Sequence, residues 1–271
     1  MDDLIQSYLT IFCLGVGSMI SLRNLGISIK YYFSRHYGKI SDMFRIICNY
    51  TILWQFVLLF GYYAAPSQIT LRGCQALGYI YLIGRTIFRI SFAAYLLWRL
   101  RKIEKKQKDS IIGSGLLIIM TSFSILLFIF IIPQIFQETD SGTITIYYCD
   151  YEENEPTEIL TWCSIIMDFT VYTYVTIRLI QILRHNSNQV ESTTTSDNEL
   201  SESYRVKMIN WSLILSSLSF LMIWFEFLND QSNGVTGGSI LLFVLKTLLY
   251  TALSFIITID DVRPPINEIN E

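Results

Sequence analysis

The stretch IIGSGLLIIMTSFSILLFIFII, residues Ile111–Ile132, runs for 22 residues without a charged side chain. An α-helix needs about 20 such residues to cross a hydrocarbon core of roughly 30 Å. Six more apolar runs of similar length occur, at 4–22, 44–65, 76–97, 159–182, 208–227 and 239–259. A soluble domain does not need seven runs of this kind. The sequence therefore predicts an all-α bundle of seven transmembrane helices within residues 1–262, followed by a short cytosolic tail, 263–271.

The charged residues between the runs follow a pattern that predicts the orientation of the chain. Lys and Arg occur almost entirely on alternate connections, namely the first, third and fifth, whereas the connections on the opposite side carry only Arg72. Because basic connections stay in the cytosol, the N-terminus should lie outside and the C-terminus inside. We therefore expect an integral protein of a lipid bilayer, in the plasma membrane.

Two of the five cysteines fall on the predicted outer side. Cys74 lies at the start of the third run and Cys149 lies in the second outer connection, where an oxidising compartment permits a disulfide between them. Two free thiols are the alternative. The segment GTITIYYCDY around Cys149 alternates β-branched and aromatic residues after the Asp140-Ser141-Gly142 turn, which predicts a short β-hairpin.

Taken together, seven helices, an outer N-terminus, Cys74 and Cys149 resemble the G-protein-coupled receptor superfamily. Arg99 lies 25 residues after Cys74, the same interval that rhodopsin-like receptors show between the corresponding cysteine and arginine. The resemblance implies that Arg99 holds helix six in the off state and meets a heterotrimeric G protein in the on state. We accordingly predict a partner-facing surface that includes Arg99, Arg101 and Lys102. Ordinary topology-setting charge is the alternative explanation for that basic segment.

Several signature motifs of rhodopsin-like receptors are absent, so the resemblance is one of topology. The Asp-Arg-Tyr triplet is replaced by Trp98-Arg99-Leu100, and the seventh run has no Asn-Pro-x-x-Tyr. In the sixth run Trp224 is followed two residues later by Glu226 and not by proline. The sequence thus indicates a divergent receptor-like protein.

Charged groups inside the apolar runs are the candidate site. Such groups are costly in a membrane and usually face partners or a water-filled cavity. We expect Arg85, Lys246, Glu226 and Tyr81 to line a polar cavity in the outer half of the bundle, where they would bind an unknown small anionic or polar ligand. We expect Arg89 and Asp168 to form a structural ion pair. In the alternative interpretation all of these charges are structural pairs without a ligand.

The sequence therefore predicts a receptor-like protein that passes an extracellular small-ligand signal to a cytosolic partner. A small transporter or channel with an intramembrane charged pathway is the alternative. A retinal-binding photoreceptor, with a Schiff base on Lys246, is a third reading, although Leu77 and Leu242 occupy positions where such proteins carry acidic residues. The only histidines, His36 and His185, lie in cytosolic connections, and no hydrolase motif occurs. We predict no enzymatic activity, no cofactor or metal, and no nucleic-acid partner.

Overall fold

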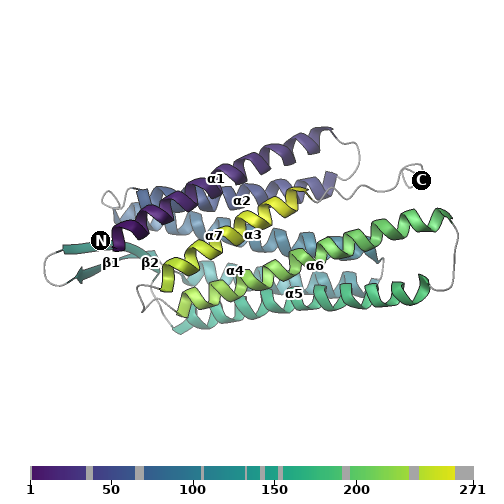
Figure 1. The fold of residues 1–271 in the computed structure, drawn as a ribbon. Coiled ribbons are helices and arrows are strands. Elements are labelled where there is room, and N and C mark those ends of the chain that lie inside the picture. The colour runs from purple at the N-terminus through teal and green to yellow at the C-terminus, as the bar shows by residue number, and fades with distance from the viewer. Residues whose placement is uncertain are drawn as a thin grey trace.

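The computed structural model describes residues 2–34, 39–64, 70–104, 107–131, 133–140, 144–151, 155–190, 196–231 and 238–259. Its helices lie side by side along one direction (Figure 1), and all seven are long and apolar enough to cross a membrane. The elements in chain order are α1 (Asp2–Ser34), α2 (Lys39–Ala64), α3 (Leu71–Ile103), α4 (Gln107–Phe130), β1 (Pro133–Asp140), β2 (Ile144–Tyr151), α5 (Glu155–Val190), α6 (Ser196–Gln231) and α7 (Gly238–Ile259). The seven-helix bundle predicted from the apolar runs is confirmed.

Two ends of the bundle are useful as landmarks. The strands β1 and β2 lie at the end where α1 begins, and we call this the hairpin end (Figure 1). At the opposite end α7 stops and α3 finishes with Arg101 and Lys102 in its last turn, so we call it the basic end. Because the described residues form an odd number of helices, α1 begins at the hairpin end and α7 finishes at the basic end.

The helices are longer than the apolar runs from which they were predicted. α5 and α6 each have 36 residues, which corresponds to roughly 54 Å at 1.5 Å per residue. Both project past the rest of the bundle at the basic end (Figure 1). The predicted bounds of 159–182 and 208–227 were short because hydropathy marks only the part inside hydrocarbon, whereas backbone hydrogen bonding continues the helix into water. The predicted tail, 263–271, lies outside the described residues.

The strands β1 and β2 pair antiparallel, from Pro133 opposite Tyr151 to Asp140 opposite Ile144. Both strands pack against α3, so they cover its first turns at the hairpin end. The fourth helix ends at Phe130, two residues before the end of its apolar run, and the chain enters β1 at Pro133. The side chains of both strands lie outside the described residues.

The core is built around α3, which packs against α2, α4, α5 and α6. Phe88 and Phe92 of α3 are fully buried and stack on each other, with ring centroids 5.7 Å apart. Phe88 also packs against Tyr250 of α7, and Phe92 packs against Tyr172 of α5. Since aromatic rings dominate core burial, these contacts fix α3 between α5 and α7.

The outer surface of the bundle is apolar, as a lipid-facing surface must be. Large side chains of α4 such as Ile118, Ile125 and Ile129 are exposed by 66%, 55% and 64%. Soluble monomers rarely expose contiguous apolar surface on this scale. The protein therefore places its apolar residues on both the inside and the outside, which fits a bilayer around the helices.

Candidate functional site

A cavity of about 190 Å³ lies between α2, α3 and α7. It is lined by Gln55, Phe56, Leu59, Tyr81, Phe243, Lys246, Thr247 and Tyr250. Lys246 is eight residues from the hairpin end of α7, Gln55 nine from that of α2, and Tyr81 ten from that of α3. At 1.5 Å per residue these positions lie roughly 12–15 Å below the hairpin end. The cavity therefore belongs to the half of the bundle that the hairpin covers.

Two of the four predicted ligand contacts, Tyr81 and Lys246, meet at this cavity although they come from different helices. Among the described residues, Arg85 does not line it. Glu226 falls within α6, but its side chain lies outside the described residues. The structure thus brings together one cation and one phenol of the predicted set.

Gln55 is one of six cavity residues that the sequence analysis missed, and its surroundings are unusual. Its side chain is only 3% exposed, and its amide nitrogen has no hydrogen-bond partner. A buried donor without an acceptor costs about 1–3 kcal/mol, so such atoms are rare and call for an explanation. The signal was present in the sequence, because Gln55 is a lone amide inside the apolar run TILWQFVLLF.

Arg89 and Asp168 lie together between α3 and α5. The Arg89 Nε donates a hydrogen bond of 2.6 Å to Asp168 Oδ2, and its Nη2 contacts the same carboxylate oxygen. The Nη2 also donates to the Ser164 carbonyl at 3.0 Å. Both charged side chains are almost fully buried, so the pair connects the two helices inside the bundle. Neither residue lines the cavity described above.

At the basic end, Arg99 of α3 reaches α6. Its Nη2 donates to the Met208 carbonyl at 3.1 Å, and its Nη1 donates to the Tyr95 hydroxyl at 3.2 Å. The guanidinium also lies over the Tyr95 ring, 5.6 Å from the centroid. Because Arg99 is only 2% exposed, its charge faces α6 and not the surface in this conformation, which differs from the predicted partner-facing position.

The two other basic residues predicted to face a partner have different surroundings. Arg101 turns toward α4, where its Nη2 donates to the Ser110 carbonyl at 2.7 Å and to Ser114 Oγ at 2.8 Å. Lys102 is exposed, with its ammonium 5.9 Å from the centre of the Trp98 ring. Of the three predicted residues, Lys102 alone is exposed at the surface.

A second, partly buried charge cluster at the basic end was not predicted. Arg178 of α5 donates to both carboxylate oxygens of Asp109, at 3.0 and 2.6 Å, and to Glu104 at 3.1 Å. The Tyr174 hydroxyl donates to Asp109 at 2.7 Å. This cluster ties the end of α3 and the start of α4 to α5. Arg178 could have been recognised as a charge within the apolar run YTYVTIRLI.

A neutral polar cluster joins α1, α2 and α7. Asn49 donates to Ser28 at 3.0 Å and to Thr258 at 2.9 Å, and it accepts from Ser254 at 2.7 Å. Asn24 donates to Ser254 at 2.9 Å. Every one of these side chains is buried. Inside a membrane such amides and hydroxyls hold helices together, because no water is available to replace the bonds.

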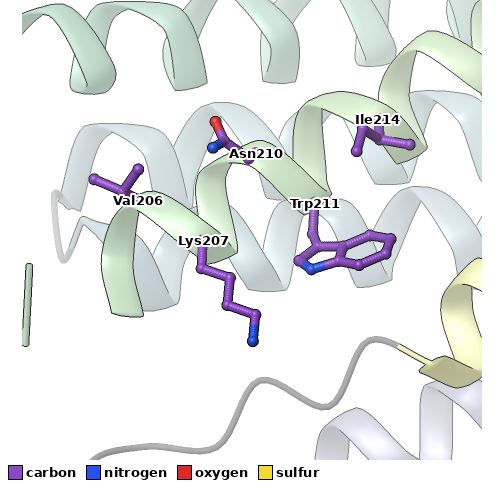
Figure 2. A pocket seen from close by; sticks show the side chains of 5 residues that line it. All are labelled: Val206, Lys207, Asn210, Trp211 and Ile214. Carbon is purple, nitrogen blue, oxygen red and sulfur yellow. The ribbon is translucent and has the colours of Figure 1, made fainter. Parts of the chain in front are cut away.

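A shallow hollow of about 370 Å³ lies along α6 near the basic end. It is lined by Val206, Lys207, Asn210, Trp211 and Ile214 of this one helix. Figure 2 shows Lys207 and Trp211 extending to the same side of α6. Lys and Trp are residue types that are typical of a membrane–water boundary, so this part of α6 has the composition expected of such a boundary.

The cysteines whose side chains are described fall into two groups, free thiols within the helices and one disulfide-bonded residue at the hairpin end. Cys13, Cys48 and Cys163 are free and lie within helices. Cys74 is fully buried at the start of α3 and is disulfide-bonded. The side chain of Cys149 lies outside the described residues, so the pairing of Cys74 with Cys149 stays a prediction.

Comparison with known proteins identifies the fold. No known protein family and no curated protein matches the sequence. Among solved structures, the chain is similar to the crystal structure of squid rhodopsin, with a TM-score of 0.57 over 92% of this chain and 80% of the rhodopsin chain. Sequence identity is 14%, so the likeness concerns the fold alone. The chain therefore has a seven-helix fold similar to that of squid rhodopsin.

Proposed function

We propose that this protein is a membrane receptor that passes an extracellular small-ligand signal to a cytosolic partner such as a heterotrimeric G protein. The observation that carries the proposal is Arg99, which joins α3 to the Met208 carbonyl of α6 at the basic end. The positive-inside rule assigns that end to the cytosol. A signal then consists of a shift in the balance between this closed arrangement and one in which α6 has moved away.

The cavity near the hairpin end supports the same function, because it offers a place for a ligand. It lies in the half of the bundle covered by the hairpin and is lined by α7 as well as α2 and α3. α7 also packs against α6. A ligand in the cavity therefore contacts α7, which adjoins α6, the helix bonded to Arg99. Ligand binding is coupled to the movement of α6 if the ligand binds more tightly to one of the two arrangements, closed or open, than to the other.

The described helices support a receptor over the transporter or channel that the sequence left open. Secondary transporters commonly bind their substrates at breaks in transmembrane helices. Each of the seven described helices runs without interruption between its bounds. The buried charges Arg89 and Asp168 bond to each other, so they lock two helices together and do not line a polar path.

A conservative change beside Arg99 tests the proposal. Tyr95→Phe removes the hydroxyl that accepts from Arg99 Nη1 and leaves Arg99 itself in place. A hydrogen bond of about 1 kcal/mol corresponds to roughly a fivefold shift between the two arrangements. We expect basal activation of one G-protein class to rise about fivefold in cells that carry a panel of G-protein biosensors. Tyr50→Phe, which alters an exposed tyrosine of α2, is the matched control and should change nothing.

Surface expression is matched between the variants by an epitope tag. Equal biosensor signals for the wild type, Tyr95→Phe and untransfected cells across every G-protein class would overturn the proposal of G-protein coupling. If Tyr50→Phe raised basal G-protein activation as much as Tyr95→Phe, the contact between Tyr95 and Arg99 would not have the role proposed for it.

A further inference from the structure

The polar groups around the cavity are biased toward hydrogen-bond donors. Gln55 presents an amide nitrogen that is buried and has no acceptor. Lys246 presents an ammonium with three N–H donors, so it can serve a ligand oxygen in addition to other partners. The described lining residues include no Asp or Glu. The cavity therefore favours a ligand that accepts hydrogen bonds and carries negative charge.

Three hydroxyl-bearing residues, Tyr81, Thr247 and Tyr250, also line the cavity. Thr247 already donates to the Phe243 carbonyl at 2.9 Å, as is usual for a threonine within a helix. Tyr81 is the lining residue from α3, and its phenol can donate or accept. Gln55, Tyr81 and Lys246 thus approach the space from three different helices, which is how a planar group with several lone pairs is held.

Aromatic rings and aliphatic side chains form the rest of the lining and limit the size of the ligand. Phe56 and Tyr250 meet edge to face, with ring centroids 6.3 Å apart and an interplanar angle of 83°, and Leu59 and Phe243 complete the wall. The volume of about 190 Å³ is below the roughly 300–1,000 Å³ of pockets for drug-sized ligands. A bound molecule has therefore a small apolar body, such as a single ring or a short alkyl chain.

From these three features we propose that the cavity binds a small monocarboxylic acid with an apolar body, and that Lys246 and Gln55 hold its carboxylate. The ion pair supplies charge attraction, and the Gln55 amide gains the acceptor that it lacks without ligand. The aromatic wall takes the ring or alkyl chain. This inference names the ligand class of the proposed receptor, so it rests on the proposed function.

Direct binding to the full-length protein in lipid nanodiscs tests the inference. Benzoate and hexanoate are the carboxylate probes, and benzamide and benzylamine are the neutral and cationic counterparts. A charge-assisted hydrogen bond contributes about 1.5–3 kcal/mol. We therefore expect calorimetry to show benzoate binding about tenfold to a hundredfold more tightly than benzamide, and no heat from benzylamine.

Two pairs of variants assign the effect to the cavity. Lys246→Met should abolish benzoate binding, whereas Lys207→Met, on α6 near the basic end, should leave it unchanged. Gln55→Leu should weaken benzoate binding at least tenfold and at the same time raise the melting temperature of the ligand-free protein, because it removes a buried donor without a partner. Gln75→Leu on α3 is its control. A merely structural Gln55 would not change stability and affinity in opposite directions.

Equal affinity for benzoate and benzamide, or no binding of either carboxylate at millimolar concentration, would overturn the inference. The assay contains no G protein, so it separates the two proposals. Carboxylate binding without any biosensor response would remove the proposed coupling and leave the ligand class standing. A biosensor response to another ligand, with no carboxylate binding, would do the reverse.

Discussion

The ion pair between Arg89 and Asp168 allows a quantitative test of what holds the bundle together. The pair joins α3 to α5 and is almost fully withdrawn from the surface. Replacing Arg89 by Met leaves the Asp168 carboxylate buried without its cation, which costs about 3–5 kcal/mol. Since each 1.4 kcal/mol is a factor of ten, the folding equilibrium should fall by about a hundredfold to several thousandfold.

The double variant separates the charge from the packing. Arg89→Met combined with Asp168→Leu replaces the pair with apolar side chains of similar volume, which is often neutral or stabilising. We expect its stability to lie within about 1 kcal/mol of the wild type or above it. Arg184→Met, at an exposed position of α5, should change stability by less than about 0.5 kcal/mol.

Unfolding can be followed in detergent with a thiol-reactive dye once the partly exposed Cys13 and Cys163 have been replaced by serine in every variant. The dye then reports on Cys48, which is fully buried and becomes accessible only when the bundle opens. A single Arg89→Met variant that unfolds within about 1 kcal/mol of the wild type would refute the reasoning. So would a double variant that is as unstable as the single one, since the loss would then come from packing and not from an uncompensated charge.

Three further changes test other parts of the bundle, each read by the same unfolding assay. Asn49→Ala removes three buried hydrogen bonds that join α1, α2 and α7, so it should cost about 2–4 kcal/mol; a loss below 1 kcal/mol would show that the cluster contributes little. Arg178→Leu leaves Asp109 buried without its cation, and because Arg178 is itself 20% exposed we expect a smaller loss of about 2–3 kcal/mol than at Arg89; an additional Asp109→Leu should recover most of it. Gly17→Ala places a methyl group 2.8 Å from Phe56 Cε2, which should lower the stability by about 1–3 kcal/mol. Since Phe56 lines the cavity, the same change should weaken benzoate binding in the calorimetric assay. Unchanged affinity would show that the Phe56 ring has room to move outward.

The number of helices was predictable because a membrane imposes a simple local requirement. Each span needs about 20 apolar residues, and that requirement is visible in a run such as 111–132 without knowledge of any neighbour. The ends of the helices were less predictable. α5 continues to Val190 and α6 starts at Ser196, because polar residues outside the hydrocarbon remain helical wherever the backbone continues its own hydrogen bonds.

The sequence predicted that a polar site lies inside the bundle, but it did not predict all of the residues that line it. A charge within an apolar run signals a partner or a cavity, and Lys246, Arg89 and Asp168 were selected on that ground. Gln55 carries no charge and was passed over, although its amide lines the cavity beside Lys246. Arg99 was expected at a partner-facing surface, and in the structure it turns inward to α6.

The sequence by itself determined that the chain is a seven-helix membrane bundle, since the length and polarity of each segment set whether it enters lipid. Only the tertiary structure decided which polar groups meet. Arg89 lies 79 residues from Asp168, and Asn49 lies 209 residues from Thr258. Side chains on separate helices become partners only when each helix has a particular rotation about its axis and a particular position along it. The sequence of one apolar run does not determine either quantity. For that reason Gln55, Tyr81 and Lys246 form a cavity that only the packed bundle displays.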